Sequence, residues 1–374
     1  MKKTLFFFTT ILLIGTVYSQ NTLVYQDTIP FKNDLGLIII PISFNGVVKQ
    51  FVFDTGAQKS VAYSWAEKTL QKTSKTSTVI SSSGLKSKMH FYNSGVIALG
   101  SRKIKGHQIL NTPKNSIFSC YRVDGILGVD IIKEFNWTID YKNKILIMYP
   151  PNYIPEKVKS MHQLNFDFRK NRPAVFLKFK NNRLKFLLDT GAGGFSNISR
   201  RNYTLTNLDE YPQVSIYSGS FDVNGILTSS KPKIIKLPDA SSKKVIVSPI
   251  IYYNAKKSTK IGNHLWGEKE LFLSLKKDRL YLSSSKINEE YQGYSCSVMY
   301  YKGKMRIMRI QAGSPIWNSG VRQGDEILLY NGKRFNDFCS LDQYHRKIVL
   351  SGESFEIKLS SGKTVTILKN SSLQ

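Results

Sequence analysis

Two short segments with the same sequence carry the residues whose types and spacing could do chemistry. Each begins with an aspartate that is followed by threonine, glycine and alanine, at residues 54–57 and again at residues 189–192. Two carboxylates held close together cannot both ionise at small cost, so they share one proton. The ionised member can then take a proton from a water molecule, while the protonated member donates one to a carbonyl oxygen. Asp54 and Asp189 therefore predict acid–base chemistry on a bound water.

The residues around the two copies indicate whether each is an ordinary turn or part of a functional site. A single Asp-Thr-Gly is typical of an ordinary strand-to-turn corner, because Asp accepts hydrogen bonds and Gly tolerates positive φ. Here an apolar strand precedes each copy, and an apolar element containing glycine follows at residues 125–128 and 260–263. Gly128 follows Asp54 by 74 residues, and Gly262 follows Asp189 by 73 residues. This internal repeat predicts two all-β lobes whose pairing brings the aspartates together at their junction.

The lead-in to each aspartate predicts a hairpin. In the first copy, Asn45-Gly46 is a tight-turn signal between two apolar, β-prone runs. In the second copy, residues 174–179 and 184–188 form the strands, and Asn181-Asn182 forms the turn. The ends of the two copies also match, because residues 138–147 and 272–282 both read as a strand, a charged turn and a strand.

With these motifs the chain resembles bacterial retropepsin-like aspartic proteases that carry two lobes on one chain, over roughly residues 21–285. The resemblance implies two pepsin-like β-barrel lobes and an endopeptidase that cleaves polypeptides at an Asp54/Asp189 dyad without cofactor or metal. It implies that the threonines cross-brace the two active-site loops and that the glycines leave room for the substrate backbone. The residues that would support the loops in this way are Thr55, Gly56, Ala57, Thr190, Gly191 and Ala192.

The family also covers its substrate with hairpin flaps. The candidates are residues 79–85, with Ser83 and Gly84, and residues 216–220, with Ser218 and Gly219. Plain surface hairpins are the alternative, since Gly/Ser tips serve both roles. One departure from the family pattern is Lys260, which replaces an expected aliphatic residue in the element behind the second loop.

Residues 287–374 repeat neither lobe and read as a smaller α+β unit. Ser314-Pro315 predicts a helix start, and Gly and Asn-Gly turns follow it. Together these motifs resemble a PDZ domain of the bacterial protease type. The resemblance implies a groove that takes a peptide C-terminus by strand addition, near Gly293, Tyr294, Ser295 and Cys296. A structural cap on the second lobe is the alternative, and regulation of the active site is a third possibility.

The N-terminus predicts export. Residues 1–19 combine a basic start, a short apolar run and a small residue at the expected signal-peptidase cleavage site, as a secretory signal peptide does. An uncleaved anchor is the alternative. We expect a first lobe at residues 20–152, a second at 153–286 and the PDZ-like unit at 287–374. No second apolar run of spanning length follows, so we expect no stable membrane span and a location in the periplasm, at the cell surface or outside the cell.

The remaining composition limits the partners. The chain has 54 Lys and Arg against 26 Asp and Glu, a formal net charge of +28. This charge favours anionic partners or reflects a Lys-rich composition, and no nucleic-acid motif accompanies it. The three cysteines allow one bridge, for which Cys296–Cys339 is the expected pair, and the histidines lack metal-ligand spacing. We expect a monomer, and the alternative function is a non-catalytic peptide-binding or adaptor protein on the same fold.

Overall fold

The computed structural model describes residues 26–80, 86–112, 120–221, 227–254, 258–291 and 293–370. Most of its elements are strands, which confirms the mostly-β prediction. The expected signal peptide and the flap candidates Ser83 and Gly84 lie outside these residues. Within the described ranges, no helix has both the length and the apolar character needed to cross a membrane.

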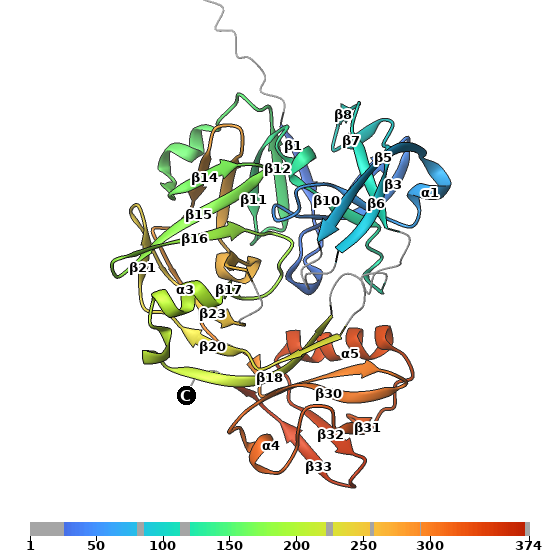
Figure 1. Ribbon diagram of the computed structural model, residues 1–374, viewed down its shortest axis with the longest axis vertical. Coiled ribbons are helices and arrows are strands. Elements are labelled where there is room, and N and C mark those ends of the chain that lie inside the picture. The colour runs from blue at the N-terminus through green and yellow to red at the C-terminus, as the bar shows by residue number, and fades with distance from the viewer. Residues whose placement is uncertain are drawn as a thin grey trace, which may run out of the picture.

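The first Asp-Thr-Gly copy lies in a nine-stranded sheet with the order β5-β6-β9-β4-β10-β3-β2-β7-β8 (Figure 1). Its elements are β2 (Ile39–Phe44), β3 (Val47–Phe53), β4 (Val61–Tyr63), α1 (Ala66–Thr69), β5 (Gln71–Ile80), β6 (Lys86–Asn93), β7 (Ile97–Leu99), β8 (Arg102–Ile104), β9 (Gln108–Thr112), β10 (Gly125–Leu127) and α2 (Val129–Ile132). The β2–β3 hairpin closes at the predicted turn, where Asn45 and Gly46 both have positive φ. Strand β3 lies inside the sheet and ends at Phe53, so Asp54 follows directly at its C-terminal end.

The second copy repeats this arrangement. Its elements are β14 (Phe166–Arg169), β15 (Arg172–Phe179), β16 (Asn182–Leu188), β17 (Ser196–Ile198), α3 (Arg200–Leu205), β18 (Gln213–Phe221), β19 (Leu227–Ser230), β20 (Lys233–Lys236), β21 (Ala240–Ser242), β22 (Val245–Ser248), β23 (Ile250–Tyr253), β24 (Lys260–Ile261) and β27 (Lys286–Asn288). The β15–β16 turn is Lys180-Asn181, one residue earlier than predicted, because Phe179 pairs with Asn182. In both copies the strand before the aspartate pairs in parallel with the later apolar element, β3 with β10 and β16 with β24.

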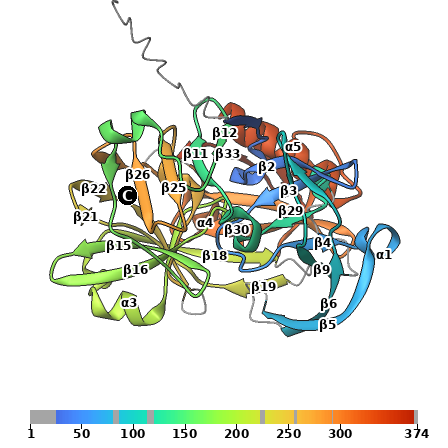
Figure 2. The ribbon, with the colours of Figure 1, turned by 90° about the horizontal axis from the view of Figure 1, so that it is seen from above.

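A six-stranded sheet joins the two halves, with the order β1-β12-β11-β25-β26-β13 (Figure 2). Its strands are β1 (Asp27–Pro30), β11 (Asn136–Asp140), β12 (Ile145–Tyr149), β13 (His162–Gln163), β25 (Glu270–Ser274) and β26 (Arg279–Leu282). Strands β11 and β25 pair antiparallel, with Trp137 opposite Leu273. All five residues of β11 are buried, and one hydrophobic core runs through both halves. Burial of this apolar surface holds the two halves together.

The C-terminal unit has a hydrophobic core of its own, which includes Ile307, Tyr330 and Phe355. Its elements are β28 (Gly293–Tyr294), β29 (Cys296–Tyr301), β30 (Lys304–Gln311), α4 (Pro315–Asn318), β31 (Glu326–Tyr330), α5 (Phe338–Ser351), β32 (Phe355–Leu359), β33 (Thr364–Ile367) and β34 (Lys369–Asn370). Helix α4 begins as predicted, because Ser314 caps it by accepting a hydrogen bond from the backbone N–H of Trp317.

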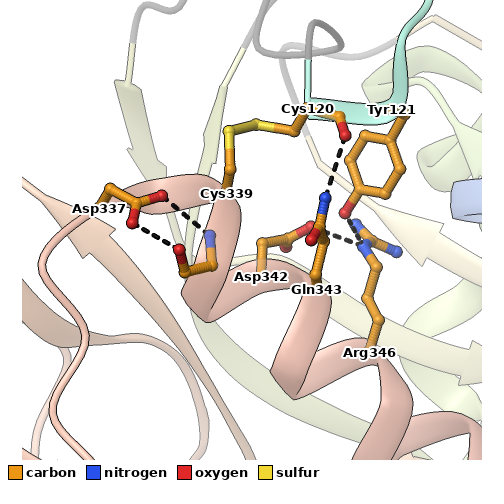
Figure 3. Close-up of a disulfide and its surroundings, with 8 residues drawn as sticks. Cys120, Tyr121, Asp337, Cys339, Asp342, Gln343 and Arg346 are labelled. Carbon is orange, nitrogen blue, oxygen red and sulfur yellow. Dashed lines mark hydrogen bonds and ion pairs between the residues drawn. A yellow bond between two sulfur atoms is a disulfide. The ribbon is translucent and has the colours of Figure 1, made fainter.

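A strand pairing and a disulfide are among the contacts that bind the C-terminal unit to the rest of the molecule. Strand β18 of the second half pairs with β30, with Tyr217 opposite Ile310, so that one hydrogen-bonded network crosses the boundary (Figure 1). A disulfide joins Cys120 of the first half to Cys339 in α5, with their Cα atoms 5.3 Å apart (Figure 3). The expected Cys296–Cys339 bridge is therefore wrong. Cys296 begins β29 with only 1% of its surface exposed, and its side chain belongs to the core.

Side chains around the disulfide reinforce this contact (Figure 3). Gln343 Nε2 donates a hydrogen bond to Cys120 O at 3.1 Å. Arg346 Nε donates to the Tyr121 hydroxyl, and its guanidinium lies 5.3 Å from the centre of the Tyr121 ring. The outer face of α5 is thus a docking surface for the first half of the chain.

Replacing Cys339 by serine is expected to lower the free energy of unfolding by about 2–4 kcal/mol, because the cross-link closes a long loop and so restricts the unfolded chain. Denaturant unfolding of the purified protein measures this loss. Cys296→Ala, which leaves the bridge intact, is the matched control. A peptide map under non-reducing conditions that lacks a Cys120–Cys339 cross-linked peptide would contradict the pairing.

Candidate active site

Each aspartate is held at the end of its strand by the same backbone contact. The N–H of Asp54 donates to Leu127 O at 2.9 Å, and the N–H of Asp189 donates to Ile261 O at 3.1 Å. The apolar elements detected downstream in the sequence thus lie directly beside the two loops. The parallel pairing of β10 and β24 with the hairpin strands explains why the spacing between these motifs is nearly equal in both copies.

The two loops face one another closely. A Cβ atom built on Gly56 would lie 2.5 Å from Asp189 Oδ1, and one built on Gly191 would lie 2.2 Å from Asp54 Cγ. Contacts this short leave no space for a side chain, so only glycine allows the two loops to approach. Each carboxyl therefore lies against the glycine of the opposite loop, and the structure brings Asp54 and Asp189 together.

Reciprocal hydrogen bonds join the loops beneath the aspartates. The N–H of Thr55 donates to Thr190 Oγ1 at 2.9 Å, and the N–H of Thr190 donates to Thr55 Oγ1 at 3.1 Å. Each hydroxyl then donates across to the opposite strand, Thr55 to Leu188 O and Thr190 to Phe53 O, both at 2.7 Å. Both threonines are fully buried. This is the cross-brace that the family resemblance implied, and it fixes the relative position of the two carboxyls.

Replacing Thr190 by valine is expected to destabilise the protein by about 1–3 kcal/mol, because buried backbone groups of both loops lose their partner. Thr190→Ser keeps the hydroxyl and is the matched control. Thermal or denaturant unfolding measures the difference. Equal stability of the valine and serine variants would show that the hydroxyl does not brace the loops.

The pKa of Asp54 lies far above that of an ordinary aspartate. Burial raises it most, the charge of Asp189 raises it further, and the net pKa is about 7. The backbone N–H groups of Gly56 and Ala57 donate to Asp54 Oδ1 at 2.7 and 3.1 Å. The Gly56 bond and the charge of Lys260 lower the pKa, but burial and Asp189 outweigh them. Asp54 therefore keeps a proton in the folded protein up to about neutral pH.

Asp189 has a different partner. Lys260 Nζ lies 2.7 Å from Asp189 Oδ2, and only 19% and 12% of the two side chains are exposed. The equivalent residue in the first half is Ile126, which packs against an apolar cluster. The sequence pointed to Lys260 only as an unexpected charge at an apolar position, and its contact with the dyad was not predicted.

Polar contacts behind the loops were also missed from the sequence. Ser60 Oγ donates to Asp130 Oδ1 at 2.8 Å and accepts from the N–H of Gly128 at 3.0 Å. Burial raises the pKa of Asp130. In the second half, Asn263 Nδ2 donates to Gly36 O of the first half at 2.8 Å. The only sequence signal for Asp130 and Asn263 is their position just after the glycine of each downstream element.

The second flap candidate lies in a hairpin formed by β18 and β19. Residues 216–220 are part of β18, which continues to Phe221, and their role as a flap stays a prediction. Ser218 pairs with Arg309 of β30 and with Ser230 of β19, and Gly219 pairs with Ser229. The strand continues through the Ser-Gly segment because neighbouring strands provide backbone hydrogen bonds for it.

The predicted groove residues are mostly inside the C-terminal unit. Gly293 and Tyr294 form β28, which pairs with β34. The Tyr294 hydroxyl donates to Glu353 O at 2.8 Å, and Ser295 and Cys296 are buried. Burial raises the pKa of the Cys296 thiol to about 12. The side chains of Tyr294, Ser295 and Cys296 are thus committed to the interior, which leaves mainly backbone groups for any ligand.

The arrangement can perform acid–base chemistry on water. One carboxyl is protonated near neutral pH, a second is ion-paired, and rigid loops hold both. Among the described residues, no group of three or more His, Cys, Asp or Glu side chains is placed to hold a metal ion.

Residues 40–131 match the family model described as aspartyl protease. The matched segment includes Asp54, its loop and the downstream element at residues 125–128, whereas Asp189 lies outside it. No curated protein matches the chain. The match supports a proteolytic function.

Proposed function

We propose that this protein is an exported aspartic endopeptidase in which Asp54 and Asp189 form one catalytic dyad. The observation that carries the proposal is the reciprocal bonding of Thr55 and Thr190, which holds two Asp-Thr-Gly loops from separate halves face to face. The halves then correspond to two pepsin-like or retropepsin-like lobes at residues 20–152 and 153–286. The aspartyl protease match over residues 40–131 supports the same function.

The dyad would cleave a peptide bond without a covalent intermediate. One carboxylate takes a proton from a bound water, which attacks the peptide carbonyl carbon, and the protonated carboxyl donates to the carbonyl oxygen. The substrate is therefore a polypeptide. Because the pKa of Asp54 is about 7, the singly protonated dyad persists to near-neutral pH, and we propose activity that declines as the pH rises above about 7.

For the C-terminal unit we propose a PDZ-like fold at residues 287–374 whose main role is to cap the protease. The Cys120–Cys339 disulfide and the β18–β30 pairing join this unit to both halves, which supports a structural or regulatory role. Binding of a peptide C-terminus is the second role we consider. The predicted signal peptide at residues 1–19 supports export, and the disulfide fits an oxidising compartment.

The proposed function is tested by incubating the mature chain with a diverse peptide library from pH 3 to pH 8 and identifying products by mass spectrometry. Cleavage at internal peptide bonds, with a shared residue preference, is the expected result. A correctly folded, disulfide-bonded protein that cleaves no peptide at any pH would overturn the proposal. It would favour the non-catalytic peptide-binding alternative.

A further inference from the structure

The two halves differ at one position beside the dyad. Ile126 pairs with Val52, two residues before Asp54, and Lys260 pairs with Leu187, two residues before Asp189. The two positions have the same backbone pairing. The side chain of Ile126 is apolar, whereas that of Lys260 brings a positive charge next to the Asp189 carboxyl. Lys260 Nζ reaches Asp189 Oδ2 at 2.7 Å.

We propose that Lys260 is a positioning residue of the dyad, which holds Asp189 as the carboxylate and so places the shared proton on Asp54. Asp189 is then the base that activates water, and Asp54 is the acid that donates to the carbonyl oxygen. The inference rests on the proposed function, because these two roles require a substrate.

Burial and charge support this assignment. An opposite charge within about 4–6 Å favours the ionised form of a carboxyl, and the effect is largest where water is partly excluded. The ion pair of Lys260 and Asp189 is mostly buried. The charges that act on Asp54 are those of Asp189, which raises its pKa, and the more weakly acting Lys260, which lowers it. Burial, which is the largest cause, acts together with these charges to raise the pKa of Asp54 to about 7, so Asp54 carries the proton.

The assignment gives a balanced reaction. Asp189 takes a proton from water as the water oxygen bonds to the carbonyl carbon, and Asp54 gives its proton to the carbonyl oxygen. The neutral tetrahedral diol then breaks its C–N bond as Asp189 returns a proton to the nitrogen and Asp54 recovers one from a hydroxyl. Both carboxyls regain their starting forms, one water is consumed, and Lys260 stays protonated throughout.

Three variants test the inference: Lys260→Met, Lys260→Ile and Lys260→Arg. The isoleucine variant places in the second half the residue type that the first half has at this position, so it is a second neutral variant if methionine impairs folding. Arginine keeps the charge. The parent and the variants are compared by kcat/KM against pH on a peptide that the parent cleaves, and by thermal unfolding.

Without the ammonium, both limbs of the bell-shaped pH profile should move to higher pH by about one unit or more. At a pH below the acid limb, a one-unit shift is about a tenfold loss of kcat/KM. The arginine variant should keep the parent profile. A neutral variant whose limbs coincide with those of the parent, whether its activity is unchanged or uniformly reduced, would overturn the inference and leave Lys260 a structural role.

A measurement without substrate separates this inference from the proposed function. Carboxyl ¹³C NMR on aspartate-labelled protein, assigned with Asp54→Asn and Asp189→Asn, follows each carboxyl as the pH changes. The Asp189 resonance should titrate at higher pH in Lys260→Met than in the parent. If it does so in a protein that cleaves no peptide, the proton placement stands and the proposed function fails. If an active parent shows no such change, only the inference fails.

Discussion

Replacing either Asp54 or Asp189 by asparagine is expected to lower kcat by about 10³-fold, because an amide can neither take the proton of the attacking water nor supply one to the carbonyl oxygen. The two single variants should be affected to a similar extent, since the reaction needs both members of the pair. The measurement is the rate at which a peptide identified in the library is cleaved, followed by mass spectrometry.

The control for this prediction is Asp130→Asn, which changes a buried carboxyl outside the dyad and can still accept the hydrogen bonds of Ser60. It should retain activity. Full parental activity in Asp54→Asn or Asp189→Asn would contradict a shared dyad.

The same variants report on stability. Folding raises the pKa of Asp54 from 3.8 to about 7, so its contribution to stability is fully present at acidic pH and is lost progressively as the pH rises through this range. Asp54→Asn should remove this loss, so that the unfolding temperature varies less with pH between about 4 and 7 than it does in the parent. A variant and a parent with identical pH dependence would contradict the elevated pKa.

Gly191→Ala is expected to have the second largest effect. The added methyl group would lie 2.2 Å from Asp54 Cγ and 2.3 Å from Asp54 Oδ2, so the loops must separate or the carboxyl must move. Overpacking of this kind costs about 1–3 kcal/mol of stability. A displacement of about 1 Å in a catalytic group can cost about 10²-fold in rate. Steady-state kinetics and thermal unfolding of the same preparation measure both effects.

Gly194→Ala is the matched control from the same loop. A Cβ atom at Gly194 would meet nothing within 4 Å, and so this variant should keep the activity and stability of the parent. The prediction is wrong if both alanine variants behave alike, since close approach of the loops would then not explain the glycine at residue 191.

Local signals in the sequence were enough to predict the first hairpin and the start of one helix. Turn chemistry at Asn45-Gly46 and the apolar runs around it predicted the first hairpin, and Ser314-Pro315 predicted the start of α4. The internal repeat predicted that Asp54 and Asp189 share one environment. Each of these signals lies within a few residues of the feature that it predicts, or is repeated at a nearly constant spacing.

Contacts between distant segments could not be predicted in this way. The segment at residues 216–220 was predicted only as part of a flap hairpin, and its pairing with strand β30 of the C-terminal unit at residues 216–218 was not predicted. Cys339 was paired with Cys296 because both are in the C-terminal region, whereas 219 residues separate it from its partner Cys120. Pairings of this kind depend on how three units pack, and no local pattern encodes that packing.

The sequence by itself determined the identity of the two aspartates, the threonines and glycines that follow them, and the mostly-β character of the chain. It did so because a duplicated motif and strand periodicity are properties of neighbouring residues. Only the tertiary structure decided that Thr55 bonds to Thr190, that Lys260 pairs with Asp189, and that the pKa of Asp54 rises to about 7. These properties depend on distance, burial and charge in space, which arise only when the two halves meet.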